Sequence, residues 1–242
     1  MIPAAVFLSF LLLTLPAVAQ VNCNEGMEPI DRDAPSSMSA FEFTHAVADK
    51  EVTLAKALAK FGYRVEVNVQ TVMDDSVDGE FRQTFDVLFD DNGARAAKPV
   101  DAATNTLSRF KLSSKDVDTL VSAPPFALTP DVLAEKDAVY SGRQQIGQYS
   151  PSVFDLLPRN DQAPLHGFIG RVWVWPSKNA VLRSCGRSTA YPIAPMRYEI
   201  LRQRVGEEYW FPASIRADEN VHSDGSPVHL RVNVEYSDYK AR

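Results

Sequence analysis

Apolar residues recur at helical spacing in one long stretch near the start of the chain. Ser39 and Glu42 have the S-x-x-E spacing of a capping box. The apolar positions that follow are Val47, Leu54, Leu58 and Phe61. Gly62 then supplies a residue that tolerates the left-handed conformation at a helix end. The pattern predicts one amphipathic helix from Ser39 to Phe61, about five to six turns long.

The apolar period then changes to two, which is the period of a strand with one buried face. One such run places its apolar side chains at Tyr63, Val65, Val67 and Val69. The next run does so at Phe81, Phe85, Val87 and Phe89, and turn residues follow at Asp90, Asp91, Asn92 and Gly93. Two successive one-sided strands predict an antiparallel sheet.

The middle of the chain predicts a short helical insertion. Ser113 and Asp116 form a second capping arrangement, and prolines at 124 and 125 stop the helix that it begins. Thr129 and Pro130 have the residue types of an N-cap and a first helical position. Between the two helices lies an apolar plug, and its residues are Phe126, Ala127 and Leu128.

Strand patterns return from the insertion to the end of the chain. The candidates are residues 138–146, 152–157, 168–175, 180–186, 196–205, 209–217 and 228–239. Strand and helix do not alternate strictly, which disfavours a doubly wound parallel sheet. The expected fold is α+β and mainly β: a strongly curved antiparallel sheet, a half-open β-barrel, wrapped around the long helix and the helical insertion.

The first 19 residues read as a secretory signal peptide. An apolar run from Ala4 to Leu15 precedes Pro16 and the small-x-small triplet at 17–19. The run is shorter than the ~20 apolar residues of a membrane span. We therefore expect a periplasmic protein with a signal peptide at 1–19, a polar leader at 20–38 and a single domain at 39–242.

The net charge bears on the class of partner, and the cysteine content bears on a possible disulfide. The net charge is −6 and the basic residues form no cluster, so nucleic acid is an unfavourable partner. After export two cysteines remain, Cys23 and Cys185. In an oxidising compartment they can pair as a disulfide that ties the leader to the sheet, or both can stay reduced and unrelated.

Sequence motifs of catalysis are absent. The histidines, at 45, 166, 222 and 229, lack the spacing of a metal site, and neither H-E-x-x-H nor G-x-S-x-G nor a Gly-rich phosphate loop occurs. We expect no catalytic residues, no metal, no cofactor and no enzymatic activity.

The segment GRVWVW at 170–175 carries apolar residues on both faces. Val172 and Val174 alternate with Trp173 and Trp175, so either protein covers both faces or one face lines a cavity. Arg171 shares the tryptophan face, where a guanidinium can stack on an indole or reach an anionic head group. Candidate residues of an apolar ligand wall or lid are therefore Phe126, Leu128, Arg171, Trp173 and Trp175.

Six segments resemble, in this order, a family of exported bacterial proteins. They are PPFALTPDVLAEKDAVYSGRQQIG, SVFDLLP, GRVWVW, EYWFP, IRADENVH and VNVEYSDYK. That family is similar to the periplasmic lipoprotein carrier and the outer-membrane lipoprotein-sorting proteins. The resemblance implies a half-open barrel lidded by helices, with a cavity for acyl chains. This chain has Trp175 where the family usually carries an acidic residue.

Two functions remain open. One is a non-enzymatic, monomeric binding protein that holds an acyl chain, a lipid or a lipoprotein, in lipoprotein sorting to the outer membrane. The alternative is an envelope sensor or scaffold that uses the same fold to bind a protein partner. Fold alone does not choose between them.

Overall fold

The computed structural model describes residue 23 and residues 27–90, 92–122, 128–159, 167–188 and 196–242. The helices in these ranges are α1 (Ala40–Leu58), α2 (Ser114–Val121), α3 (Pro130–Ala134) and a short 3-10 helix, η1 (Pro176–Lys178). The strands are β1 (Phe61–Met73), β2 (Ser76–Phe89), β3 (Arg95–Pro99), β4 (Thr104–Asn105), β5 (Lys136–Arg143), β6 (Ser152–Pro158), β7 (Phe168–Trp175), β8 (Ala180–Ser188), β9 (Arg197–Val205), β10 (Tyr209–Ser223) and β11 (Ser226–Ala241).

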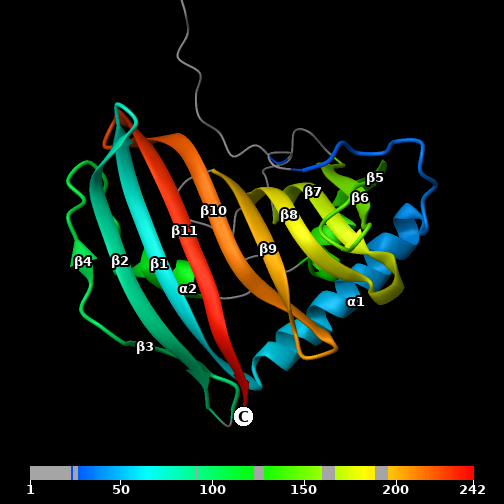
Figure 1. Ribbon diagram of the computed structural model, residues 1–242, viewed down its shortest axis with the longest axis horizontal. Coiled ribbons are helices and arrows are strands. Elements are labelled where there is room, and N and C mark those ends of the chain that lie inside the picture. The colour runs from blue at the N-terminus through cyan, green and yellow to red at the C-terminus, as the bar shows by residue number, and fades with distance from the viewer. Residues whose placement is uncertain (1–22, 24–26, 91, 123–127, 160–166, 189–195) are drawn as a thin grey trace, which may run out of the picture.

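All described strands form one antiparallel sheet. Its order is β3-β2-β1-β11-β10-β9-β8-β7-β6-β5, and β4 pairs with β2 beside β3. The sheet ends at β3 on one side and at β5 on the other, so it curves without closing (Figure 1). The predicted fold class, a half-open antiparallel barrel around helices, is confirmed.

Helix α1 begins as predicted, because Ser39 caps the Glu42 amide while the Glu42 side chain accepts from the Ser39 amide. Its predicted end is wrong. The helix stops at Leu58, and Gly62 is the second residue of β1. A Cβ on Gly62 would lie 2.9 Å from Cδ2 of Leu88, so the glycine allows the close approach of β2 and does not terminate the helix.

The helical insertion also has the predicted starts. Ser113 and Asp116 form a capping box on α2, and the Thr129 hydroxyl caps α3, whose first residue is Pro130. Leu128 is buried in the main core. Phe126, the centre of the predicted plug, lies outside the described residues.

The main core fills the concave side of the sheet. Alternate residues of β1 and β11 are buried there, and they include Val65, Val67, Val69, Leu230, Val232 and Val234. Helix α1 contacts β5, β8 and β10, whereas α2 contacts β1 (Figure 1). The described helices thus pack against the concave face of the sheet, as the one-sided strand patterns predict.

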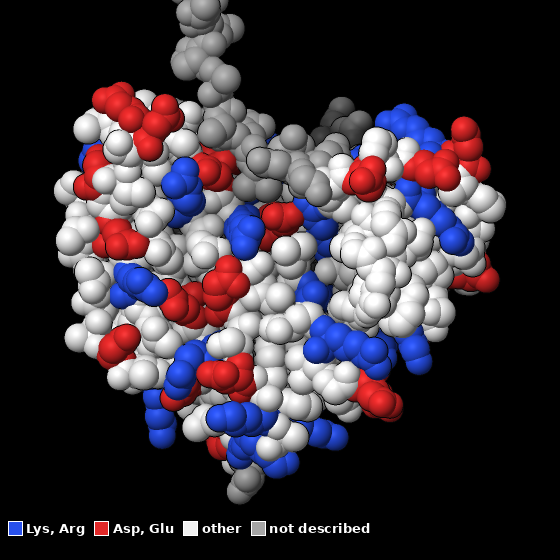
Figure 2. Space-filling model, in the orientation of Figure 1, with Lys and Arg blue, Asp and Glu red and all other residues white. Residues whose placement is uncertain are grey.

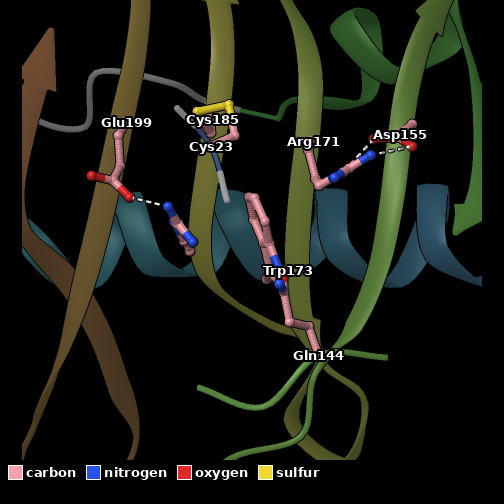
Figure 3. Close-up of a disulfide and its surroundings, with 8 residues drawn as sticks. Cys23, Gln144, Asp155, Arg171, Trp173, Cys185 and Glu199 are labelled. Atoms are coloured by element: carbon pink, nitrogen blue, oxygen red, sulfur yellow. Dashed lines mark hydrogen bonds and ion pairs between the residues drawn. A yellow bond between two sulfur atoms is a disulfide. The ribbon is translucent and has the colours of Figure 1, made fainter. Parts of the chain in front are cut away.

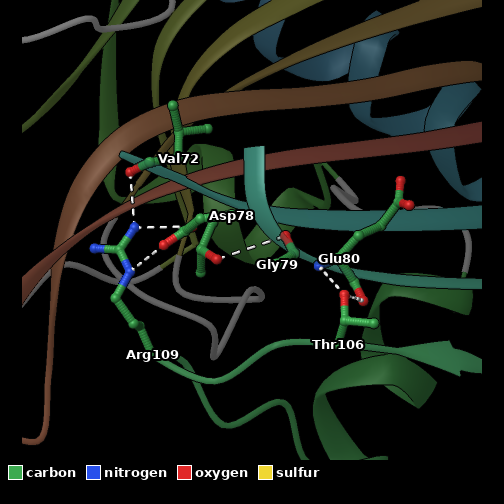
Figure 4. A network of polar contacts seen from close by, with 7 residues as sticks. Val72, Asp78, Gly79, Glu80, Thr106 and Arg109 are labelled. Carbon is green, nitrogen blue, oxygen red and sulfur yellow. Dashed lines mark hydrogen bonds and ion pairs between the residues drawn. The ribbon is translucent and has the colours of Figure 1, made fainter. Parts of the chain in front are cut away.

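Strands β3 and β4 were not predicted, and side-chain contacts hold the chain around them. Arg109 makes a two-point ion pair with Asp78, at 2.6 and 2.9 Å, and also donates to the Val72 carbonyl at 2.9 Å (Figure 4). The Thr106 hydroxyl accepts from the Glu80 amide at 3.0 Å (Figure 4). These contacts fasten the segment that follows β4 onto the tip of the β1–β2 hairpin.

Surface charge is mixed. Figure 2 shows acidic and basic side chains interspersed over the long strands, without a large area of one sign on this face.

Candidate functional site

Strand β7 is covered on both faces from Val172 to Val174, whereas Ile169, Gly170, Arg171 and Trp175 are partly exposed. Val172 and Val174 belong to the main core on the concave side. Trp173 belongs to a separate cluster with Val153 and Cys185. Its exposed fraction is 0%.

The leader covers Trp173 on the convex side of the sheet. A disulfide joins Cys23 to Cys185 on β8 (Figure 3). Met27 and Ile30, which follow Cys23 in the leader, pack against the Trp173 cluster. The disulfide and these apolar contacts hold the leader against the sheet.

Most polar groups around Trp173 have partners inside this cluster, but the buried Nε of Arg183 has no hydrogen-bond partner among the described residues. The indole Nε1 donates to Oε1 of Gln144 at 2.6 Å (Figure 3). The Arg183 guanidinium carbon lies 4.6 Å from the Trp173 ring centroid, a cation–π distance. Arg183 also forms an ion pair with Glu199. Burial lowers the pKa of Arg183, although the Glu199 carboxylate opposes that shift.

Arg171 pairs with Asp155 on the neighbouring strand β6 (Figure 3). Its Nε and Nη2 donate to the two carboxylate oxygens at 2.7 and 3.0 Å. Burial alone would raise the pKa of Asp155, but hydrogen bonds from Arg171 and Ser141 outweigh it and the pKa is lowered. The Arg171 guanidinium therefore lies against a carboxylate and not on an indole.

Trp175 belongs to a third cluster. Its ring centroid lies 5.1 Å from that of Tyr149 and 6.1 Å from that of Trp210. The Tyr149 and Trp210 rings meet edge to face at 5.2 Å. The predicted wall residues are thus distributed over different clusters: Leu128 on the concave side, and Arg171, Trp173 and Trp175 in separate contacts along β7.

The described residues instead enclose an apolar groove at the rim of the half-barrel. It lies between the first half of α1, helix α3 and the end strand β5, and its volume is about 940 Å³. We call it the α1–β5 groove. Its apolar walls are Ala40, Phe41, Ala48, Pro130, Leu133, Ala134, Ala138 and Val139, and its polar lining residues are Thr44, His45, Asp49, Lys136, Asp137 and Arg159.

Phe41 is the most exposed large apolar side chain of the described residues, at 70%. Its ring lies 4.1 Å from the His45 ring, and His45 Nδ1 lies 3.0 Å from the Phe41 carbonyl oxygen. At the other end of the groove, Arg159 pairs with Asp137 at 3.1 Å. The groove therefore offers apolar contact along its walls and charged side chains among its lining.

Sequence reasoning missed this groove. Phe41 is the second residue of α1 and lies outside the buried face of that helix, and this position was the one sequence feature that pointed to the groove. A large aromatic residue off the buried face of a helix marks either a contact with a partner or isolated exposure.

The described residues contain no group of three or more His, Cys, Asp or Glu side chains that could hold a metal ion. Nor does any helix among them have the length and apolar character needed to cross a membrane.

No family model matches the chain, and no curated protein matches it. Several solved structures have a similar fold. A DUF1329 family protein from Desulfovibrio piger is 10% identical, with a TM-score of 0.40, and the match covers 84% of this chain and 94% of that one. A LolA superfamily protein from Nitrosomonas europaea is 12% identical, with a TM-score of 0.34 and coverage of 81% and 93%. A putative outer membrane lipoprotein-sorting protein domain from Vibrio parahaemolyticus is 7% identical, with a TM-score of 0.34 and coverage of 80% and 91%.

Proposed function

We propose that the protein is an exported, non-enzymatic binding protein that holds the acyl chain of a lipid or of a lipidated protein in the α1–β5 groove. The observation that carries the proposal is the groove itself, an apolar depression of about 940 Å³ at the rim of the half-barrel. This volume lies within the range of about 300–1,000 Å³ that is usual for small-molecule sites.

Apolar burial supplies the affinity. Each methylene removed from water contributes about 0.8 kcal/mol, so a long acyl chain needs few polar contacts. An occupant would also cover Phe41, whose exposure is otherwise unfavourable. The Arg159 side chain among the lining residues offers a cation to an anionic head group.

The burial of the described concave face favours a binding site at the rim. Its side chains are already covered by the helices of the protein, and residues such as Val65, Val232 and Ile215 are fully buried. An acyl chain in the groove would lie beside that core and would not need to displace it. Lipoprotein sorting to the outer membrane is the role that the sequence resemblance implies for such a carrier.

The experiment is the uptake of a fluorescent fatty acid by the purified full chain, followed by fluorescence titration. Ala134 is exposed and lines the groove, so Ala134→Trp fills the groove without disturbing the core. We expect this variant to weaken binding by about tenfold or more, which corresponds to about 1.4 kcal/mol. Ala96→Trp, at an exposed position of β3, is the matched control and keeps the affinity.

Native mass spectrometry of protein purified from its exported compartment gives a second measure. We expect a lipid mass that the wild-type protein carries and Ala134→Trp loses. Equal fatty-acid binding by wild type and Ala134→Trp, or none by either, would rule out the groove as an acyl site.

A further inference from the structure

Strand β5 ends the sheet, and its outer edge is largely unpaired among the described residues. Its inner edge pairs with β6 from Lys136 to Arg143. On the outer edge, one bridge joins Arg143 to Asp31 of the leader. Upstream of that bridge, the β5 edge borders the α1–β5 groove.

The hydrogen-bond phase identifies the backbone groups that point outward. The Arg159 amide donates to the Glu135 carbonyl at 3.2 Å. In an antiparallel ladder the bonded residues alternate, so residues 135, 137 and 139 face β6. The position of Pro158 opposite Lys136 agrees with this phase, since a proline has no amide to donate. The amide and carbonyl of Ala138 therefore point away from the sheet.

Apolar surface flanks this edge on two sides. The α1–β5 groove borders it on one side, and a second groove of about 500 Å³ is lined by Val139, Leu157 and Ile169, among others. Val139 and Leu157 are 47% and 50% exposed. A strand added to β5 would direct alternate side chains to opposite faces of the sheet. Each face would then meet one of the two grooves.

The leader already uses the same edge in this way. The Asp31 amide donates to the Arg143 carbonyl at 2.8 Å, and the Arg143 amide donates to the Asp31 carbonyl at 2.9 Å. The Tyr140 hydroxyl also donates to the Ala34 carbonyl at 2.9 Å. Extended chain therefore pairs with the downstream end of β5, and the open positions continue upstream along the same strand.

The opposite edge of the sheet differs. Strand β3 has five residues. The Asp90 amide donates to the Ala94 carbonyl, and the Val100 amide donates to the Thr84 carbonyl. Because bonded residues alternate along the ladder, the backbone groups of Ala97 and Pro99 point away from β2. Pro99 therefore removes an outward donor from that edge, a common protection against strand addition. The outer edge of β5 has no proline from Lys136 to Arg143.

We propose that the edge of β5 binds an extended segment of a partner polypeptide by strand addition. The segment carries apolar side chains on the face that meets the second groove, beside Val139 and Leu157, and the backbone of Ala138 pairs with it. This goes beyond acyl binding, because the recognised groups are peptide N–H and C=O and the ligand is a polypeptide. It also specifies the chemistry of a protein partner, which the sequence left open.

The test uses the full chain and a dye-labelled synthetic peptide of alternating valine and threonine, with fluorescence anisotropy as the readout. Two further peptides are N-methylated on alternate residues, one in each frame. In one frame the methyl groups replace the donors that face β5, whereas in the other they face solvent. We expect one frame to lose binding and the other to keep it. Equal binding of both frames, or no binding of the unmethylated peptide at about millimolar concentration, overturns the proposal.

Two variants locate the site. Ala138→Pro removes the outward amide without removing a bond to β6, and we expect about tenfold weaker peptide binding. Ala97→Pro makes the same change on the outward phase of β3 and leaves binding unchanged. If Ala138→Pro does not fold, as judged by circular dichroism, Val139→Lys places a charge beside the edge and serves in its place.

Two further outcomes would overturn strand addition at β5. Equal peptide affinity for wild type and the folded β5 variant overturns the proposal. A concentration-dependent dimer of the protein alone that Ala138→Pro abolishes would assign the edge to a second copy of this chain and overturn it as well. Ala134→Trp tests the two proposals separately. If this variant loses fatty-acid uptake but still binds the peptide in one frame only, both proposals hold.

Discussion

Glu51 of α1 and Arg202 of β9 form a buried two-point ion pair between the helix and the sheet. The two Nη–Oε distances are both 2.6 Å. The side chains are 3% and 7% exposed, respectively. Because both charges are removed from water, each depends on the other for its solvation. The pair therefore fastens α1, the helix that also carries Phe41 of the groove, to β9.

Breaking this pair is expected to destabilise the fold strongly. Glu51→Gln leaves the Arg202 charge buried without its partner, and we expect the free energy of unfolding to fall by about 3–5 kcal/mol. Urea denaturation followed by circular dichroism measures it. Glu66→Gln is the control, because Glu66 pairs with Arg82 at a surface position where we expect less than about 1 kcal/mol. A loss as small as that of the control would contradict the structural role of the pair.

Replacing both Glu51 and Arg202 tests whether the pair stabilises the fold beyond the mutual neutralisation of its charges. In the double variant Glu51→Leu with Arg202→Leu no charge remains buried, so we expect stability close to that of the wild type. A double variant as unstable as Glu51→Gln would show that the pair contributes more than mutual neutralisation.

The disulfide is expected to hold the leader over Trp173. In the double variant Cys23→Ser with Cys185→Ser, closure of a loop between residues 162 apart is lost. We expect about 2–5 kcal/mol lower stability and a red shift of tryptophan emission as water reaches the Trp173 cluster. Trp173→Phe in the same background is the control, since it removes the residue that reports the shift. An unshifted emission maximum would mean that the leader stays in place without the bond.

Periodicity predicted the elements whose side chains carry the core. Val65, Val67 and Val69 alternate in the sequence because one face of β1 is buried, and the capping box at Ser39 is a local hydrogen-bond pattern. Such elements follow from neighbouring residues alone. The curved sheet could be predicted because nearly all the strands have one apolar face, and the few predicted helices had to cover all of these faces.

Other features depend on contacts that no local pattern records. Strand β3 is mostly exposed and is held by pairing with β2, so it lacks an apolar period. The two covered faces of β7 could be read from Val172 and Trp173, but the identity of the cover could not. That cover is the leader, which reaches Trp173 through a bond between residues distant in sequence. The groove likewise arises where α1, α3 and β5 meet.

Glu219 is a buried carboxylate, and its Oε1 has no hydrogen-bond partner among the described residues. It is 6% exposed and lies between Ala217 and Val221 on the concave side of β10. Burial of an unpaired charge is unfavourable, so we expect Glu219→Gln to raise the free energy of unfolding by about 1 kcal/mol or more. Chemical denaturation measures it. Glu207→Gln, at an exposed turn, is the matched control and should change stability little.

A lower stability of Glu219→Gln would contradict this prediction. It would indicate that the ionised carboxylate itself stabilises the concave face. The sign of the change therefore decides whether Glu219 is a stabilising or a destabilising member of the concave face.

The ion pair of Asp155 and Arg171 predicts a pH dependence. Although burial works against it, Arg171 and the Ser141 hydroxyl lower the pKa of Asp155 in the folded state. The unfolded chain, with a carboxyl pKa of about 3.9, then takes up this proton first as pH falls. The pair's stabilisation is therefore fully present above about pH 5 and is lost as pH falls through the folded pKa. Asp155 is only about half-buried, which makes the effect modest.

Arg171→Gln tests that dependence through urea denaturation from about pH 6 down to the acid limb. We expect the variant to be less stable than the wild type near neutral pH and the difference to shrink as the Asp155 carboxyl becomes protonated. Arg64→Gln is the control, because the pair of Arg64 and Asp86 is more exposed, at 43% and 49%, and should contribute less at every pH. A stability difference for Arg171→Gln that stays constant across the acid limb would mean that Arg171 stabilises β7 by packing on its neighbours and not through the Asp155 charge.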